Sequence, residues 1–482
     1  MFTSTMFLSI LPESLILVLG VILLTVEPFW KHEKRRNLGW LTAGGLLTIM
    51  VLAWLAGIPG EPQMVFGNML RFDWMGFFFK QMFLFGAGVT ALFFMDHEKV
   101  GRRGEAYLLL LASTLGMCLM ASAADLVMLY LAIETTSIPL YILAGFMLSD
   151  ERSTEAGFKY LLYGALTSTV MLYGFSLLFG FTGTTNLYQL AAMFVAGQLS
   201  PLVALGVVLL VLVGLGFKVS AVPFHFWAPD VYQGSPTPVA GFLSTASKAA
   251  GFAVLARLFV VAFTGFSVSW TFLLALLATL SMTIGNLLAL RQTDLKRLLA
   301  FSSIAHAGYA MIGVVAVSRL GITSVVFYLL AYIATNLLAF GIVMAFARVA
   351  GSDDMKAYSG LSRRSPWLAL MMLVAFLSLA GMPPFGGFVA KVFVFAAAIQ
   401  EGWVWLAIVG IINSIIGVYY YLNAMKYVYL YRMESQDEEK HPVLLTRPYA
   451  IALAVLSLAV ILVGAVFAPW FYWSASAALN LF

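Results

Sequence analysis

Apolar residues occur along this chain in long runs separated by short polar segments. Most runs have about the twenty residues that an α-helix needs to cross a bilayer. Two runs, at residues 202–234 and 366–400, are longer and contain proline. The pattern predicts about fourteen transmembrane helices, at residues 7–26, 38–57, 74–95, 104–122, 126–148, 156–181, 202–234, 239–263, 269–290, 297–318, 321–349, 366–400, 403–431 and 448–472.

The two long runs each combine proline with lysine. The seventh run carries Lys218 followed by Pro223, and the twelfth carries Pro383 and Pro384 followed by Lys391. Proline removes a backbone donor and clashes with the preceding turn, so it breaks a helix. Broken helices at membrane depth are tolerated where they line a cavity or are buried in protein. We therefore predict that the seventh and twelfth helices each consist of two half-helices, with a lysine near the break.

The two broken helices hold the same place in two groups of five consecutive runs. Because five crossings reverse the starting side, a tandem repeat of such a unit must be inverted, as in many transporters. The sequence thus predicts an all-α polytopic membrane protein with two inverted five-helix repeats. The expected parts are N-terminal helices at 1–103, a first repeat at 104–264, a second at 265–433, and a loop with a C-terminal helix at 434–482. Lys218 precedes its proline whereas Lys391 follows its own, so the register between the repeats stays open.

Composition agrees with a membrane protein, since 62% of the 482 residues are hydrophobic and 10% are charged. The polar segments are too short for a soluble domain. A single cysteine, Cys118, and five scattered histidines provide no disulfide framework and no ligand cluster for a metal or an iron–sulfur centre. The N-terminal run has no basic segment before it and no small-residue cleavage site after it, so we expect it to be retained.

Loop charges predict the orientation. Basic residues follow the odd-numbered runs, at Lys31, Lys34, Arg35, Arg36, Lys99, Arg102, Arg103, Arg152, Arg291, Lys296, Arg297, Lys356, Arg363, Arg364, Arg432, Lys440 and Arg447. The segments after even-numbered runs hold Arg71 and Arg319. Cytoplasmic loops carry the excess of Lys and Arg, so both termini are expected on the periplasmic side. The net charge of +5 comes mainly from these loops and gives no reason to expect nucleic acid.

Four charged residues lie deep in apolar runs: Glu134, Lys218, Lys248 and Lys391. A charge at mid-membrane costs about 3 kcal/mol on insertion scales, so such residues usually mark an ion path. Glu134 reads as the only carboxylate deep within a span. A carboxyl beside an ammonium can be switched between charged and neutral forms, and a buried amine can release its proton. The alternative is that hydroxyls and carbonyls hold these groups without ion traffic.

A second set of charged residues and histidines gives weaker evidence of a role in proton transfer. Lys159 lies within one turn of the inner end of its run, so it could relay protons or extend to the interface. His225 and His306 could relay protons, because neutral histidine donates at one ring nitrogen and accepts at the other, or they could be satisfied core residues. Lys80, Arg257 and Lys426 are expected to be structural, near an interface or acidic neighbours.

Four segments carry a resemblance: AIETTSIPLYIL, GLGFKVSAVPFHFWAPDVYQGSPTPVAGFLSTASKAAGF, RQTDLKRLLAFSSIAHAGY and LAGMPPFGGFVAKVFVF. Almost the whole chain resembles the antiporter-like proton-pumping subunits of complex I, most closely the N subunits of bacterial NADH:quinone oxidoreductase. The resemblance implies an ion pair of Glu134 and Lys218 in a first half-channel, with Lys159 alongside. It also implies that Lys248 and His306 link this pair toward Lys391 in a second half.

The resemblance further implies a proton-translocating subunit without a cofactor of its own, with FMN and iron–sulfur clusters on other subunits. The implied partners are membrane-arm subunits of the M, L, K, J, A and H types, the peripheral arm, lipid and protons, in a bacterial inner membrane. Two alternatives stay open. One is a subunit of a multisubunit Na⁺/H⁺ antiporter or a membrane-bound hydrogenase. The other is a structural spacer that does not pump, although a spacer has no reason to keep so many buried charges.

Overall fold

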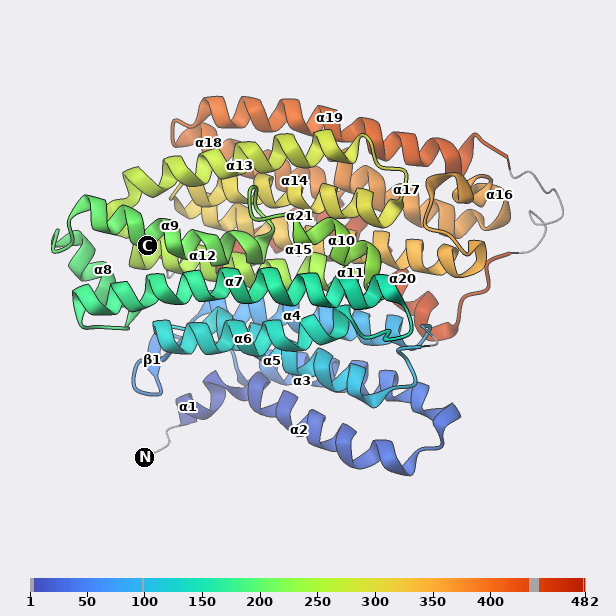
Figure 1. The fold of residues 1–482 in the computed structure, drawn as a ribbon, viewed down its shortest axis with the longest axis horizontal. Helices are drawn as coiled ribbons and strands as arrows, with labels where there is room; N and C mark the ends of the chain where they lie inside the picture. Colours follow the sequence, from blue (N-terminus) through green and yellow to red (C-terminus); the bar gives the residue numbers. More distant parts are fainter. Residues whose placement is uncertain (1–3, 98, 433–441, 480, 482) are drawn as a thin grey trace.

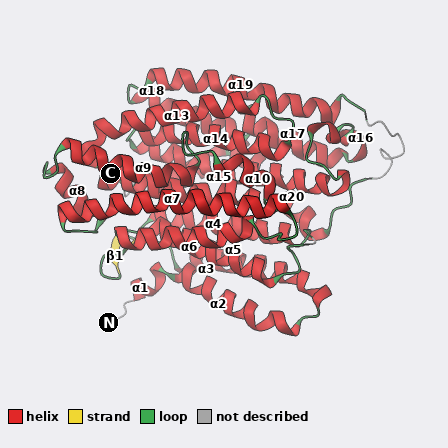
Figure 2. Ribbon diagram, viewed as in Figure 1, coloured by secondary structure: helices red, strands yellow, loops and turns green. Residues whose placement is uncertain are grey.

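The structure is a computed structural model that describes residues 4–97, 99–432, 442–479 and 481. Its long helices lie side by side along one axis, and both ends of the chain lie toward the left in Figure 1, as does β1. Nearly every described segment is helical, as Figure 2 shows. Lys440 and most of the polar loop expected at 434–447 lie outside the described residues.

Thirteen helices of the described chain are long and apolar enough to cross a membrane. They are α2 (Leu11–Val26, extended to Phe29), α3 (Leu38–Ala56), α4 (Trp74–Phe94), α5 (Gly104–Ser122), α6 (Leu126–Ala144), α7 (Glu151–Thr182), α9 (Pro201–Val219), the composite helix Thr237–Ala262, α13 (Ser267–Ala289), α14 (Leu295–Val315), α15 (Arg319–Ala350), α19 (Val404–Tyr429) and α20 (Arg447–Ala465). Two shorter apolar helices, α17 (Pro366–Ala380) and α18 (Gly386–Gln400), make the fourteenth crossing. The predicted polytopic all-α fold with about fourteen spans is confirmed.

The remaining elements are short. They are the helices α1 (Ser4–Ser9), α8 (Leu187–Val195), α10 (Trp227–Gly234), α16 (Leu361–Arg364) and α21 (Phe467–Ala478), the 3₁₀ turns Glu27–Phe29, His32–Asn37, Thr264–Phe266 and Met355–Tyr358, and the antiparallel strands β1 (Gln63–Val65) and β2 (Leu70–Phe72). The hairpin was not predicted, because three-residue strands give too little alternation to detect.

Both predicted helix breaks are present. In the first, α9 ends at Val219, Ser220 adopts a left-handed conformation with φ of 59°, and α10 begins at Trp227 beyond Pro223. In the second, α17 ends at Ala380 and Gly381 has φ of 82°, a conformation that glycine adopts at little cost. The sequence therefore placed both discontinuities correctly.

The composite helix Thr237–Ala262 differs from a regular span. It consists of α11 (Thr237–Phe242), the π-helical segment η3 (Leu243–Ser247), α12 (Lys248–Ala256) and the π-helical segment η4 (Arg257–Ala262). Such π segments are rare and frequently lie at functional sites. Hydrophobic periodicity gave no sign of them, because one extra residue per turn barely changes an apolar pattern.

The centre of the bundle is formed by α4, the composite helix, α14 and α15, whose residues are almost all buried. Outer helices such as α2, α3, α7 and α19 bury less of their surface and expose apolar side chains. The last two helices of the described chain, α20 and α21, pack against α4 and α15 (Figure 1).

Candidate functional site

Lys218 lies in the last turn of α9, beside the first break, and is buried. Its ammonium donates to the hydroxyl of Ser137 on α6 at 2.6 Å, and this hydroxyl donates to the carbonyl of Ile133. Because Glu134 precedes Ser137 by three residues, both side chains share one face of α6. The structure thus brings Glu134, Ser137 and Lys218 together.

The expected ion pair between Glu134 and Lys218 is nevertheless not formed among the described residues. The half-buried Glu134 carboxylate accepts a hydrogen bond from Ser168 on α7, and Ser137 takes the place beside Lys218. Glu134 is close enough to act electrostatically on the ammonium. In this arrangement Ser137 contacts Lys218 and Ser168 contacts Glu134, so a direct pair of Glu134 and Lys218 stays a prediction.

Lys159 makes its ion pairs with carboxylates other than Glu134. Its ammonium lies 2.6 Å from the Glu155 carboxylate and 2.7 Å from Asp230, and about a third of its side chain is exposed. Asp230, on α10, also binds Arg297 at 2.8 Å. The reason is position, since Lys159 stands near the N-terminal end of α7, level with the end of the first broken helix. A polar cavity of about 220 Å³ opens at this cluster.

Lys248 is the first residue of α12, directly after the π segment η3, and is 2% exposed. Its ammonium donates to the carbonyl of Ser303 at 3.0 Å and to the Ser303 hydroxyl at 2.8 Å. The ring of Tyr232 lies 5.8 Å away. Lys248 is thus held by neutral oxygens of α14.

His306 extends this polar region one turn along α14. Its Nδ1 lies 2.6 Å from the Tyr328 hydroxyl and its Nε2 lies 3.2 Å from the Tyr421 hydroxyl. Tyr421 also bonds Ser302, the neighbour of the serine that holds Lys248. His306 is close enough to both Lys248 and Lys391 to interact with their charges.

Lys391 lies on α18, just after the second break, and is buried. Its ammonium donates to the carbonyls of Leu379 and Ala380 at the end of α17, at 3.1 and 3.0 Å, and to Ser414 on α19 at 2.9 Å. A Cβ atom at Gly381 would lie 3.0 Å from this nitrogen, so glycine leaves the room that the lysine uses. The break itself provides the acceptors.

His225 is buried in the first break, and its Nδ1 has no hydrogen-bond partner among the described residues. The structure does not join it by hydrogen bonds to the groups around Lys248. The described residues also contain no group of three or more His, Cys, Asp or Glu side chains that could hold a metal ion.

Two other buried cations have carboxylate partners. Arg257 makes two bonds to Asp73, at 2.8 and 2.9 Å, and Lys80 lies 2.8 Å from Glu13. Burial alone would raise the pKa of Asp73, but the Arg257 guanidinium holds that pKa below its usual value. Glu13 is 4% exposed, so Glu134 is not the only carboxylate inside the bundle. The structural role expected for Lys80 and Arg257 agrees with these pairs.

The contrast between the two groups of cations is the main feature of the site. Within the described part of the chain, no carboxylate lies within ion-pair distance of Lys218, Lys248 or Lys391, whereas Lys80 and Arg257 are each paired. Burial without a counter-ion favours the neutral form of an amine, while a nearby carboxylate favours the ammonium. Lys218, Lys248 and Lys391 are therefore candidates for proton exchange. Lys296, at the start of α14, is also buried and is held by the carbonyls of Gln233 and Ser235.

Comparisons with known proteins agree with this arrangement. The family model described as NADH:quinone oxidoreductase/Mrp antiporter, TM matches residues 123–417. NADH-quinone oxidoreductase subunit N of Moorella thermoacetica is 42% identical over 98% of both chains. A chain of respiratory complex I from Thermus thermophilus with bound aureothin has a TM-score of 0.80 and 34% identity, covering 96% of this chain and 98% of that one. A chain of the Mrp complex from Dietzia has a TM-score of 0.84 at 22% identity, covering 100% of this chain and 98% of that one, and thus shares the fold.

Proposed function

This chain belongs to the NADH:quinone oxidoreductase/Mrp antiporter family, and we propose that it is the N-type, proton-translocating membrane-arm subunit of an NADH:quinone oxidoreductase. The observation that carries the proposal is the set of buried lysines held only by hydroxyl and carbonyl oxygens. Such oxygens stabilise an ammonium through fixed dipoles, without the full charge of a carboxylate. An amine held in this way can give up its proton and take up another.

The first step of translocation takes place around Lys218. Glu134 can approach Lys218 if the Ser137 hydroxyl turns away, and the attraction of the two charges then favours the ammonium. When Glu134 returns to Ser168, the lysine is left with a single hydroxyl partner. In this mechanism the pair opens and closes, and each opening allows Lys218 to release a proton.

The second step runs through α14. The Lys248 ammonium bonds Ser303, and the adjacent Ser302 bonds Tyr421, whose hydroxyl lies 3.2 Å from His306. A hydroxyl can donate and accept at once, so it can pass a proton between two nitrogen bases. Lys391 then serves as the terminal carrier next to the second break.

Several properties accompany this function. The two groups of five helices, at 104–264 and 265–433, form inverted repeats, and each contributes one broken helix. The chain lies in a bacterial inner membrane with both termini periplasmic. It assembles with membrane-arm subunits of the M, L, K, J, A and H types, and FMN and iron–sulfur clusters belong to other subunits of the complex.

A subunit of a Na⁺/H⁺ antiporter or a membrane-bound hydrogenase is the second candidate, favoured by the shared fold of the Mrp chain. The higher sequence identity of the complex I chain, 34% against 22%, favours the first candidate. A spacer that does not pump is disfavoured by Lys218, Lys248 and Lys391, which are buried inside apolar helices without a carboxylate partner among the described residues.

The test uses inverted membrane vesicles that contain the whole complex. NADH oxidation and proton uptake are measured together for Lys391→Met and for a matched control, Lys426→Met, since Lys426 is an exposed lysine. We expect Lys391→Met to lower the protons taken up per NADH oxidised and the control to keep the native ratio. A native ratio in an assembled Lys391→Met complex would refute the proposal, and a requirement for Na⁺ would favour the antiporter.

A further inference from the structure

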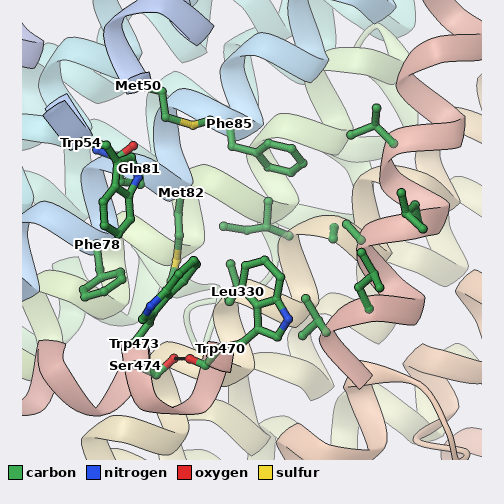
Figure 3. A pocket seen from close by; sticks show the side chains of 17 residues that line it. Met50, Trp54, Phe78, Gln81, Met82, Phe85, Leu330, Trp470, Trp473 and Ser474 are labelled. Atoms are coloured by element: carbon green, nitrogen blue, oxygen red, sulfur yellow. Dashed lines mark hydrogen bonds between the residues drawn. The ribbon is translucent and has the colours of Figure 1, made fainter. Parts of the chain in front are cut away.

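A largely apolar cavity of about 380 Å³ lies between the N-terminal helices α3 and α4, the central α15 and the C-terminal α20 and α21 (Figure 3). Its volume falls in the range of about 300–1,000 Å³ that is usual for small-molecule sites. Leu458 and Trp473 line it and are 56% and 43% exposed, so its mouth opens on the membrane-facing surface. An empty apolar space loses dispersion contacts, which favours occupation by a membrane-soluble molecule.

One polar side chain in the cavity lacks a partner. Gln81 of α4 is 8% exposed, and neither its Nε2 nor its Oε1 has a hydrogen-bond partner among the described residues. A buried unsatisfied polar group costs about 1–3 kcal/mol. Ser474 also lines the cavity, but its hydroxyl donates to the Trp470 carbonyl at 2.8 Å. The Gln81 carboxamide, which can both donate and accept, thus points to a ligand with a hydrogen-bonding group.

The depth of Gln81 decides which class of lipid can supply that group. With the middle of α4, at Leu84, taken as the bilayer centre, Gln81 lies three residues or roughly 5 Å from that centre at 1.5 Å per residue. Phospholipid esters lie at the edge of the hydrocarbon core, about 15 Å from its centre. A phospholipid could place a tail in the cavity, but its carbonyls would stay about 10 Å short of Gln81. The ligand must therefore carry its polar group within the bilayer interior.

We propose that this cavity binds the head of a prenyl quinone. A quinone carbonyl accepts a hydrogen bond from the Gln81 nitrogen, and a quinol hydroxyl donates one to its oxygen, so one carboxamide fits both forms. The rings of Trp54, Phe85 and Trp470 line the space, and aromatic side chains pack well against a planar ring. The apolar tail leaves through the mouth past Leu458.

This site is separate from the buried lysines. It joins α4 to α21, so an occupied site fastens the C-terminal helix to the N-terminal part of the bundle. The inference depends on the proposed function only for the presence of quinone in the same membrane. Its test can fail while the proton-transfer roles of the lysines stand, and the reverse also holds.

The test is photolabelling of the whole complex in its membrane by a prenyl quinone that bears an azide on the ring. We expect label in peptides of α4 or α21, and competition by an unlabelled prenyl quinone. Gln81→Leu, which removes the amide and keeps the volume, should lower labelling roughly five- to tenfold. Ala459→Phe, which fills the cavity from α20, should have a similar effect.

The matched control is Gln189→Leu, the same replacement at an exposed glutamine on α8, and it should keep full labelling. Equal labelling of Gln81→Leu and the control would overturn the proposal. An absence of label from α4 and α21 in the native complex would do the same. Displacement of the probe by added phospholipid but not by quinone would show that the cavity holds an acyl chain instead.

Discussion

Replacing Lys248 by arginine separates a proton carrier from a fixed buried cation. Both side chains carry a positive charge and can donate to the carbonyl and hydroxyl of Ser303, which hold the native ammonium. The difference is chemical, because a guanidinium stays protonated under all conditions that a protein survives. We therefore expect Lys248→Arg to assemble and to fail in proton transfer.

The magnitude follows from the proton equilibrium. With a pKa above 12, a guanidinium is deprotonated in fewer than roughly 1 in 10⁵ molecules at pH 7. Within the described residues no carboxylate accompanies Lys248, so the native amine has no comparable barrier to release. If every transported proton passes through this residue, its path should carry a flux indistinguishable from zero. Lys248→Met, which removes the charge and the donor, should show the same loss.

The assay is proton uptake per NADH oxidised in vesicles, with the amount of assembled complex measured for each variant. Lys426→Arg is the matched control, because it makes the same replacement at an exposed position. A smaller yield of assembled Lys248→Arg complex would not affect the ratio. A native ratio in that complex would refute the carrier role and leave Lys248 as a structural cation.

Two further predictions concern the ion pair of Asp73 with Arg257 and the proposed coupling of Glu134 with Lys218. Asp73→Asn should lower the free energy of unfolding by about 3–5 kcal/mol, because it leaves a buried guanidinium without its charge partner. The depressed pKa of Asp73 means that its contribution is present above about pH 4 and is lost as the pH falls through the folded value, so thermal unfolding of the two proteins should converge in acid. In a double-mutant cycle, Glu134→Gln and Lys218→Met should each impair proton uptake and the double variant should be no worse than the more severe single one, whereas losses that multiply would mean that the two residues act independently.

Much of the fold could be predicted because its signals are local. The apolar runs predicted the positions of the transmembrane helices, and the prolines at 223 and at 383–384 predicted the positions of the helix breaks. Lysines within apolar runs gave three of the buried cations, since a charge without polar neighbours in sequence must find a cavity or partner in space. Each of these inferences needs only residues within one helix.

Pairing between distant residues could not be predicted in the same way. Glu13 and Lys80 come from different helices, and nothing near either residue indicates the other. Lys159 was expected near Glu134 but binds Asp230 on the short helix α10, and nothing near either residue in the sequence indicates the other. The sequence drew attention to the hydroxyls that follow Glu134, but it could not show that Ser137 contacts Lys218, because α6 and α9 are far apart in the chain.

The second break explains how a lysine can be buried without a carboxylate. Ending α17 at Ala380 frees backbone carbonyls that a continuous helix would use internally, and two of them accept hydrogen bonds from Lys391. The end of a helix carries about half a negative charge, enough to attract an ammonium but weaker than a carboxylate. A carboxylate in this place would form a fixed ion pair, as Asp73 does with Arg257. The carbonyls freed by the proline-broken helix thus stabilise the buried ammonium but leave its proton exchangeable. A residue that translocates protons needs this property.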